Sequence, residues 1–357
     1  MKGTVPMISL GALPERLSGP SAWVGREMQA RAGEWLVDLP PAAIAELEGA
    51  ARHYLALGRD VGQITAADFP LGDVGASLER LKARLLHGVG FEVLRGLPVD
   101  RWDRRTAATV FCGIGAHLGR ARSQNAQGHV LGHVRDTGVS SRDPNVRIYQ
   151  TAERQSFHTD SADLVGLLCL RDAREGGQSL LVSAEAIYNR MRAESPDLLV
   201  RLFDPIATDR RGEVPPGAKP YLEIPPLNWH AGRLTVFYQR QYIDSAQRFP
   251  DAMRLTPDHV AALDRFDAIA NDPDMHVVMQ LRPGDLQFVY NHSQLHDRTA
   301  FVDWPEPARR RHLLRLWLSP DGDRELPPCF AERYGSLEVG HRGGVVVAGT
   351  VLTAPLD

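Results

Sequence analysis

The feature that most constrains the fold of this chain is a change of periodicity near residue 146. Before it, apolar residues recur three and four positions apart, which predicts helices at Pro41–Leu57, Val74–Leu86 and Arg104–Leu118. After it, short runs rich in leucine, β-branched and aromatic residues predict strands. These strands are Val146–Gln150, Leu164–Leu170, Ser179–Val182, Leu234–Gln239, His276–Leu281, Leu286–Tyr290 and Leu313–Leu318. Many short strands, with only two further helices at Ala184–Ala193 and Pro257–Ala270, favour a mainly β barrel or jelly roll with helical additions over a doubly wound sheet.

The predicted organisation is one structural unit with an N-terminal addition. The first 40 residues contain scattered Pro and Gly without a sustained period, so we expect an arm or lid segment there. Together with the first helices it forms an N-terminal arm and helical layer over residues 1–100. This layer is expected to pack on a catalytic domain over residues 101–357, since an elaborated all-β domain can absorb such a length.

Composition narrows the class of partner. Lys and Arg total 41 against 44 Asp and Glu, with the two signs interspersed, so no basic surface for nucleic acid or an anionic membrane is expected. Only three cysteines occur, which is unlike a secreted disulfide framework and favours a reducing, cytoplasmic compartment. No stretch approaches the roughly 18 apolar residues of a membrane span. The predicted partner is a small molecule, and the sequence is compatible with a homo-oligomer.

Two residue types that bind metals lie close together in Ser156-Phe157-His158-Thr159-Asp160-Ser161. Two histidines follow far downstream in Asn291-His292-Ser293-Gln294-Leu295-His296-Asp297-Arg298. Two imidazoles and one carboxylate can hold ferrous iron on one face and leave the opposite face open for O2 and an organic co-substrate. Because each group follows a predicted strand, a closed sheet would bring them together.

The residues alone leave alternatives open. An isolated His-x-Asp is common in exposed turns, where Asp160 would accept backbone hydrogen bonds. His292 also competes with His296 for the distant ligand position, and would otherwise support the site or face the substrate. His129 and His133, in a polar loop punctuated by glycine, lack a third ligand at a sensible spacing for a separate metal site.

An arginine cluster follows in Arg309-Arg310-Arg311-His312-Leu313-Leu314-Arg315-Leu316-Trp317-Leu318. Arg309 and Arg310 are expected on a solvated face. In the predicted strand, alternation places Leu313, Arg315 and Trp317 on one side. An arginine between two large apolar residues needs an anion as partner, and its planar fork matches a carboxylate such as the remote one of 2-oxoglutarate.

The chain resembles the Fe(II)/2-oxoglutarate-dependent dioxygenases of the taurine dioxygenase (TauD/TfdA) family. The matching elements are Phe157-His158-Thr159-Asp160, Glu175-Gly176-Gly177-Gln178-Ser179-Leu180, Asn291 five residues before His296, and Arg311-x-x-x-Arg315. The resemblance implies a double-stranded β-helix fold, iron bound by His158, Asp160 and His296, and the distal carboxylate of 2-oxoglutarate bound by Arg315 with Arg311 beside it. Ser179, where the family usually has threonine, and Asn291 are implied as further co-substrate contacts.

The resemblance also points to residues that face the primary substrate. Arg154 lies four positions before His158, with Tyr149 and Gln155 nearby, and Asn125 belongs to the polar loop that we expect over the site. An anionic or amino-acid-like substrate suits Arg154, whereas a surface arginine at a strand end is the alternative. Four other side chains could line the pocket or pack in the core: Trp229, His230, Tyr238 and Arg240.

The predicted function is an oxygenase that uses Fe(II), 2-oxoglutarate and O2. It would hydroxylate or desaturate an unactivated carbon of a small molecule and release succinate and CO2, with no separate acid or base assigned. The alternative is a metal-binding β-barrel that senses or carries without turnover. A zinc hydrolase is a weaker option, since it would also require a general base near the open position.

Overall fold

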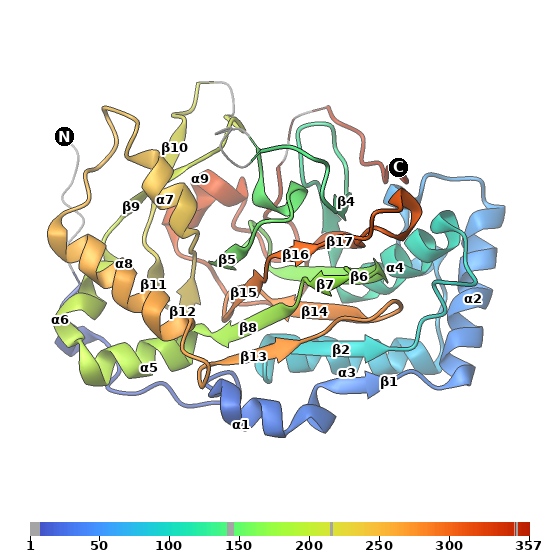
Figure 1. The fold of residues 1–357 in the computed structure, drawn as a ribbon, viewed down its shortest axis with the longest axis horizontal. Helices are drawn as coiled ribbons and strands as arrows, with labels where there is room; N and C mark the ends of the chain where they lie inside the picture. The colour runs from blue at the N-terminus through green and yellow to red at the C-terminus, as the bar shows by residue number, and fades with distance from the viewer. Residues whose placement is uncertain (1–7, 141–145, 215–216, 346, 348) are drawn as a thin grey trace.

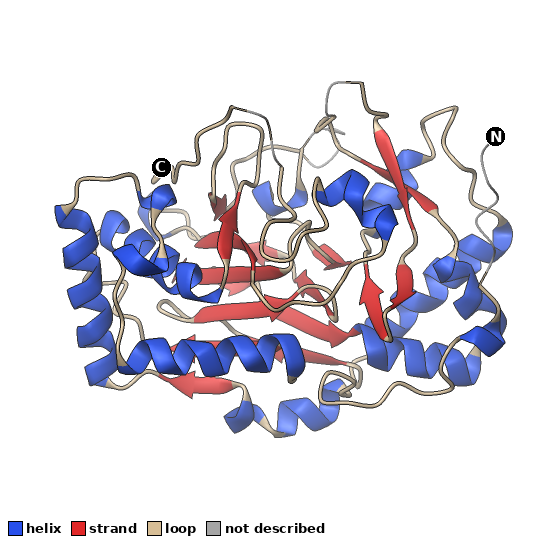
Figure 2. Ribbon diagram, turned by 180° about the vertical axis from the view of Figure 1, so that it is seen from behind, coloured by secondary structure: helices blue, strands red, loops and turns tan. Residues whose placement is uncertain are grey.

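Two β-sheets lie face to face at the centre of the molecule, with helices at either end (Figures 1 and 2). The structure, a computed structural model, describes residues 8–140, 146–214, 217–345, 347 and 349–357. The large sheet has the order β1-β2-β14-β6-β17-β3, with β4 also paired to β17. Its strands are β1 (Leu36–Asp38), β2 (Phe91–Arg95), β3 (Arg120–Arg122), β4 (Leu131–Val134), β6 (Leu164–Arg171), β14 (Leu286–Tyr290) and β17 (His312–Ser319).

The small sheet carries most of the residues of interest and has the order β13-β8-β15-β5. Its strands are β5 (Gln155–His158), β8 (Ser179–Ser183), β13 (His276–Met279) and β15 (Gln294–Arg298). Three two-stranded ribbons complete the strands among the described residues: β7 (Glu175–Gly176) with β16 (Phe301–Val302), β9 (Ile206–Asp209) with β10 (Tyr221–Ile224), and β11 (Leu227–His230) with β12 (Arg233–Val236).

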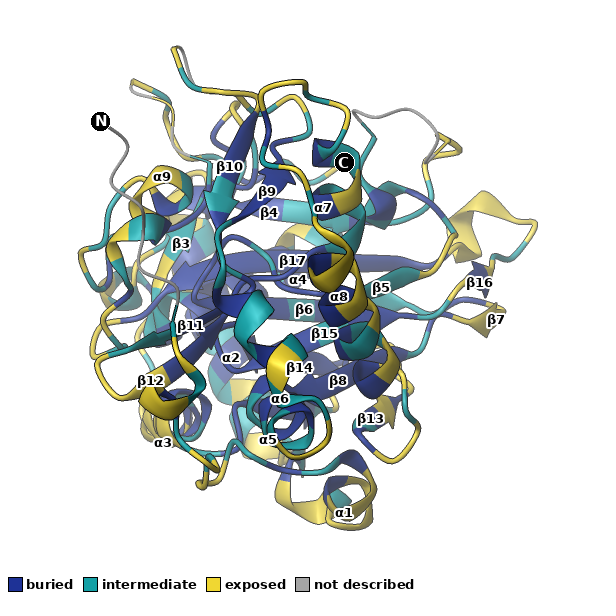
Figure 3. Cartoon of the chain, turned by 90° about the vertical axis from the view of Figure 1, so that its left-hand side faces the viewer, coloured by how far each residue is buried: buried dark blue, intermediate teal, exposed yellow. Residues whose placement is uncertain are grey.

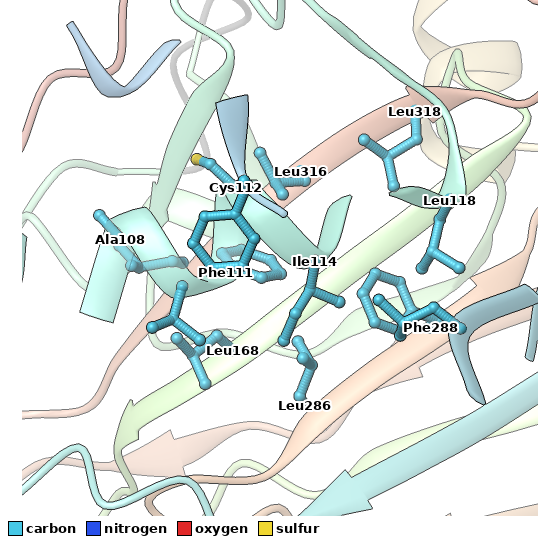
Figure 4. Close-up of a cluster of buried hydrophobic side chains, with 14 of the residues drawn as sticks. Ala108, Phe111, Cys112, Ile114, Leu118, Leu168, Leu286, Phe288, Leu316 and Leu318 are labelled. Carbon is cyan, nitrogen blue, oxygen red and sulfur yellow. The ribbon is translucent and has the colours of Figure 1, made fainter. Parts of the chain in front are cut away.

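One face of the large sheet is covered by α2 (Pro41–Ala56), α3 (Asp73–His87) and α4 (Arg104–Leu118). α4 begins where the Asp103 carboxylate accepts a hydrogen bond from the Thr106 backbone N–H. Figure 4 shows its apolar face on the sheet. The labelled core side chains include Phe111, Ile114 and Leu118 of the helix and Leu168, Leu286, Phe288, Leu316 and Leu318 of the strands.

Because side chains alternate along a strand, the residues of the large sheet that do not face the helices point toward the space between the two sheets. Leu314 and Leu316 of β17 pack under the helices, whereas Leu313 packs toward Leu181 and Val277 of the small sheet. Arg315 and Trp317 share the side of Leu313, as predicted. The strands of the two sheets are largely buried, while the outer surfaces of helices such as α1 are exposed (Figure 3).

The outer face of the small sheet is covered by the remaining larger helices. Leu180, Val182 and Leu295 pack there with Ile187 of α5 (Ala184–Glu194) and Phe266 of α8 (Pro257–Ala270). Shorter helices lie at α1 (Gly25–Ala30), α6 (Pro196–Leu199), α7 (Arg240–Ala246) and α9 (Ala331–Tyr334). Among the described residues no helix is both long enough and apolar enough to cross a membrane.

Two sequence expectations about the N-terminal half need correction. Val146–Gln150 is not a strand: Ile148–Gln150 forms a 3-10 turn, because the Thr151 N–H bonds to the Ile148 carbonyl instead of a neighbouring strand. The described part of the first 40 residues packs on the core as an arm, since Trp23, Met28 and Trp35 are buried with Phe91 in the cluster between the sheets. β1 and β2 also extend the large sheet across the division expected near residue 100.

Candidate metal centre and adjoining cavities

The two predicted histidines face each other across paired strands. His158 of β5 lies opposite His296 of β15 in the antiparallel register, and their ring centroids are 4.1 Å apart. Asp160, two residues beyond His158, brings a carboxylate oxygen to 3.8 Å from the His296 Nε2. One ligand atom from each of the three residues lies within 4.8 Å of the others. A single cation can therefore contact all three side chains.

The donor chemistry fits a divalent transition metal. The His158 Nδ1 donates to the Ser156 carbonyl at 2.8 Å, which fixes the proton there and leaves the Nε2 lone pair facing the centre. The Nε2 lies 2.8 Å from the Gln155 amide nitrogen. Burial lowers the pKa of His296 to about 3 and also lowers the pKa of His158, so both rings are neutral near pH 7. Neutral imidazoles and one carboxylate are the donors that ferrous iron binds.

Asp160 is held ionised by its neighbours. Burial acts to raise its pKa, but the Arg315 guanidinium, helped by the hydrogen bond from Trp317, outweighs this effect and leaves the pKa below its usual range. The Arg315 guanidinium lies 3.2 Å from the Asp160 Oδ2, and the Trp317 indole N–H donates to the same oxygen at 2.8 Å. One carboxylate oxygen therefore has two donors from β17.

Asn291 positions the backbone around Asp160. Its amide oxygen accepts from the Asp160 N–H at 2.9 Å, and its amide nitrogen donates to the carbonyls of Asp160 and Ala162 at 2.6 and 2.7 Å. Asn291 lines neither of the two cavities described below. The co-substrate contact predicted for it therefore does not match its position, because all its hydrogen-bonding groups serve the chain.

His292 lies in a separate buried network. Its Nε2 is 2.7 Å from Asp163, and the Arg342 guanidinium contacts Asp163 at 2.8 Å and Asp323 at 2.7 Å. Asp163, His292 and Asp323 have the spacing of a metal site. Arg342 bridges the two carboxylates, and the Ser319 and Tyr290 hydroxyls donate to them, so this network is a hydrogen-bonded ion-pair cluster that ties the C-terminal segment to the core.

A first cavity extends from the two histidines between the sheets. Its lining includes Ser179, Arg298, Arg311, Leu313 and Arg315. Two of its arginines have buried N–H groups without a hydrogen-bond partner among the described residues, namely the Nη1 of Arg311 and the Nε and Nη1 of Arg298, although the Arg298 Nη2 donates to the Glu153 carbonyl. Burial lowers the pKa of Arg311 to about 10 and that of Arg298 to about 9. Two unsatisfied guanidiniums in one cavity require an anion, and a carboxylate fits.

The paired glycines of the Glu175–Ser179 motif explain how Arg311 enters this cavity. Gly177 has a φ of +69°, and a Cβ there would lie only 3.0 Å from the Arg311 Nε. Glycine provides both the backbone conformation and the space. The Ser179 hydroxyl faces the same cavity and donates to Gln287 at 3.1 Å.

Arg315 sits at the metal end, which revises the role predicted for it. Besides Asp160, its guanidinium contacts the Gln124 amide oxygen at 2.8 Å and lies between the rings of Tyr149 and Trp317. Arg311 lies four residues away, roughly 13 Å along an extended chain. The partner of a remote carboxylate should be distant from the metal, so Arg311 fits that role better than Arg315.

A second cavity opens on the Asp160 side. It is lined by the predicted Tyr149, Gln155 and Tyr238, and by Arg147, Arg211 and Arg333, which sequence reasoning missed. Tyr149, Gln155 and Arg315 line both cavities and form the partition between them. The metal centre therefore lies where the two cavities meet.

Other predicted substrate residues lie elsewhere. The Arg154 guanidinium binds Asp297 and Asn271, each at 2.5 Å, and lines neither cavity. The Asn125 side chain accepts from the N–H groups of its own loop, and its neighbour Gln124 contacts Arg315 instead. Trp229, His230 and Arg240 are also absent from both linings, and Arg240 is paired with Asp244, Asp264 and Asp267.

His129 and His133 form no metal group among the described residues. The His129 Nδ1 lies 3.1 Å from the Asn125 amide. The rings of His133 and His312 contact each other at 2.8 Å, and the other His133 nitrogen contacts the Pro355 carbonyl. His312 is fully buried next to Arg171, so the pair joins β4, β17 and the C-terminal segment.

This histidine pair predicts a loss of stability in acid. Burial, with His133 nearby, lowers the pKa of His312 from near 6.5 to about 3. Between these values the unfolded chain binds a proton that the folded chain does not, so acid favours unfolding. The free energy of unfolding should fall by about 2 kcal/mol from pH 7 to pH 5 through His312 alone. Denaturant titrations at both pH values should show a smaller fall for His312→Gln, and an equal fall would contradict this origin.

Comparison with known proteins places the chain in a family. The family model "Taurine catabolism dioxygenase TauD, TfdA family" matches residues 54–317, a range that contains the three candidate ligands, Arg311 and Arg315. FR-33289 synthase of Streptomyces rubellomurinus (strain ATCC 31215) is 32% identical over 333 residues, which cover 90% of this chain and 96% of that protein.

Solved structures share the fold. An asparagine oxygenase in complex with Fe(II), 2S,3S-3-hydroxyasparagine and succinate has a TM-score of 0.62 at 18% identity, covering 80% of this chain and 93% of that one. The non-heme iron oxygenase OrfP in complex with Fe and alpha-ketoglutaric acid has a TM-score of 0.58 at 17% identity, covering 79% and 93%. The predicted jelly-roll core is thus confirmed. The chain belongs to the TauD/TfdA family of Fe(II)- and 2-oxoglutarate-dependent dioxygenases.

Proposed function

We propose that the protein hydroxylates an unactivated carbon of a small molecule, with iron held by His158, Asp160 and His296. The observation that carries the proposal is the position of this triad where two cavities meet, one of which contains buried arginines without partners. A metal at this junction can be reached from both sides, as a reaction with a co-substrate and a substrate requires.

The first cavity is proposed to hold 2-oxoglutarate. Arg311, with Arg298 and the Ser179 hydroxyl nearby, would bind the remote carboxylate, and Arg315 would face the end near Asp160. Gln124 positions Arg315, since it bonds both the Arg315 side chain and its backbone carbonyl at 2.8 Å. With iron bound at the triad, O2 would be the oxidant and 2-oxoglutarate would supply two of the electrons that reduce it, leaving as succinate and CO2.

The remaining residues orient the substrate and exclude water. Tyr149 and Gln155 separate the two cavities, so a substrate in the second cavity would meet the metal only at the partition. Trp317 fixes one oxygen of Asp160 and thereby the direction of its other oxygen. Desaturation uses the same residues, and the products formed from an identified substrate distinguish it from hydroxylation.

A sensor or carrier without turnover is the alternative. It would have no use for the incompletely satisfied guanidiniums in the cavity that reaches the metal, because buried charges without partners destabilise a fold. Apart from Asp160, no described residue that lines the second cavity belongs to the metal triad.

The proposal is tested by iron-dependent release of succinate from 2-oxoglutarate. We expect slow release without substrate, faster release with the correct small molecule, and no release without iron. His129→Ala is a suitable control, since this histidine lies outside the triad. Iron binding without succinate release, with every metabolite screened, would favour the sensor or carrier.

A further inference from the structure

The second cavity has a concentration of arginines that the proposed reaction does not use. Eight charged residues stand among its described lining: Arg147, Arg210, Arg211, Arg315 and Arg333, and Asp160, Asp209 and Glu213. Some are neutralised locally. Arg315 pairs with Asp160 at 3.2 Å, Arg210 with Glu332 at 2.8 Å and Asp209 with Arg248 at 3.1 Å.

After these pairs, Arg147, Arg211 and Arg333 face a single carboxylate, Glu213. Glu213 contacts Arg147 directly and lies 3.8 Å from Arg333. Three cations against one carboxylate leave two positive charges among the described residues of this wall. Bound 2-oxoglutarate would not supply the missing anion, because its two negative charges would already face the metal and the arginines of the first cavity, Arg311 and Arg298.

The three arginines are held in place by other groups. The Arg333 Nε donates to the Ser161 hydroxyl at 2.5 Å, directly beside the metal ligand Asp160. The Arg211 Nη2 donates to the Val146 carbonyl at 3.0 Å, and its guanidinium lies over the Tyr242 ring at 5.2 Å. The buried Arg211 Nε has no hydrogen-bond partner among the described residues.

The backbone at Arg211 supports a built site. Arg211 has a φ of +53°, a left-handed conformation that is costly for a residue with a side chain, and its N–H is held by the Asp209 carboxylate at 2.8 Å. The loop therefore holds Arg211 in an unfavourable backbone conformation that places its guanidinium on the cavity wall.

We propose that this wall is the substrate-recognition site, and that Arg147, Arg211 and Arg333 bind a doubly charged tetrahedral group, a phosphonate or phosphate monoester. This inference rests on the proposed function, since it names the class of substrate oxidised at the same metal. Two surplus charges match a dianion. The carboxylate and ammonium of an amino acid would leave both charges uncompensated. Because Arg333 lies next to Ser161 and Asp160, the oxidised carbon belongs to the same short molecule that bears the anion.

Two small anions of similar shape test whether the site prefers a doubly charged group to a singly charged one. Methylphosphonate can carry two negative charges, whereas methanesulfonate carries one. We expect methylphosphonate to bind the anaerobic protein loaded with Fe(II) and saturating 2-oxoglutarate roughly tenfold or more tightly than methanesulfonate at pH 8, because its second charge strengthens the hydrogen bonds from the arginines. Calorimetric titration measures both affinities. Equal affinities would overturn the proposal.

Variants test the residues. Arg333→Gln should weaken methylphosphonate binding roughly tenfold or more, while Arg309→Gln, an exposed arginine outside the cavity, should leave it unchanged. Glu213→Gln should strengthen it about tenfold, because it removes the carboxylate that opposes these arginines among the described residues of the wall. A gain of affinity cannot result from misfolding. Unchanged binding in both Arg333→Gln and Glu213→Gln would remove the cluster from the site.

The same titrations separate the two proposals. Repeating them without metal shows whether the arginines bind methylphosphonate by themselves, as we expect. If 2-oxoglutarate fails to bind the iron complex while methylphosphonate still depends on Arg333, the proposed function fails and the anion site stands. If 2-oxoglutarate binds normally and methylphosphonate shows no selectivity, the oxygenase stands and the assignment of substrate class fails.

Discussion

Alanine in place of His296 is expected to abolish both iron binding and iron-dependent succinate release, and to leave the fold intact. His296 is paired on both sides of its strand by the backbone of β5 and β8, so the strand does not depend on the imidazole. The loss of iron affinity should exceed the roughly 100-fold that is typical when only a supporting partner of a ligand is removed. The same result is expected for His158→Ala and Asp160→Ala. Iron titration and thermal melting of each variant measure the two effects separately.

His292→Ala provides the matched control. This histidine is fully buried and contacts Asp163, so its removal leaves a cavity and an unmade hydrogen bond, which should destabilise the protein by about 2–5 kcal/mol and leave the iron stoichiometry of the folded protein unchanged. Wild-type turnover in His296→Ala together with loss of iron in His292→Ala would exchange the two roles.

Arg311→Ala is expected to weaken the binding of 2-oxoglutarate roughly 30-fold or more. The substitution leaves a carboxylate in a buried cavity without its partner, which costs about 2–5 kcal/mol. Iron affinity should change little, because Arg311 contacts none of the three ligands. Anaerobic titration of 2-oxoglutarate into the iron-loaded variant measures the change.

Two other arginines serve as comparisons for this result. Arg309→Ala should be almost silent, since Arg309 is exposed, contacts Glu306 and the Trp304 ring, and lines neither cavity. Arg315→Ala should disturb Asp160 as well as the co-substrate, because its guanidinium contacts that carboxylate. A different result would contradict this assignment. If Arg311→Ala binds 2-oxoglutarate normally and Arg315→Ala loses affinity for 2-oxoglutarate alone, Arg315 is the residue that binds the remote carboxylate.

Hydrophobic periodicity predicted the parts of the fold that bury apolar side chains. Leu286–Tyr290 and the helix Pro257–Ala270 have the bounds that the pattern indicates. β15 escaped detection because its sequence, Gln294-Leu295-His296-Asp297-Arg298, is mostly polar, although the strand is central in the small sheet. The strand is polar because its inner face forms the site. The same alternation that places His296 inward also places Arg298 in the first cavity, a signal that could have identified Arg298.

The order of the two arginines and the substrate wall could not be predicted from local pattern. Which of Arg311 and Arg315 approaches the metal depends on where β17 passes β5, a long-range relation between strands. Arg147, Arg211 and Arg333 are far apart in the sequence and converge only through the loops over the second cavity. Arg154, by contrast, lies close to His158 in the sequence but is directed to Asp297.

The most direct test of the account is an anaerobic titration with Fe(II) and 2-oxoglutarate, followed by visible absorbance. The account predicts a charge-transfer band that appears only when both are present, saturates at one of each per chain, and is lost in His296→Ala. Iron that binds without any band on addition of 2-oxoglutarate, or a band that persists undiminished in His296→Ala, would contradict it.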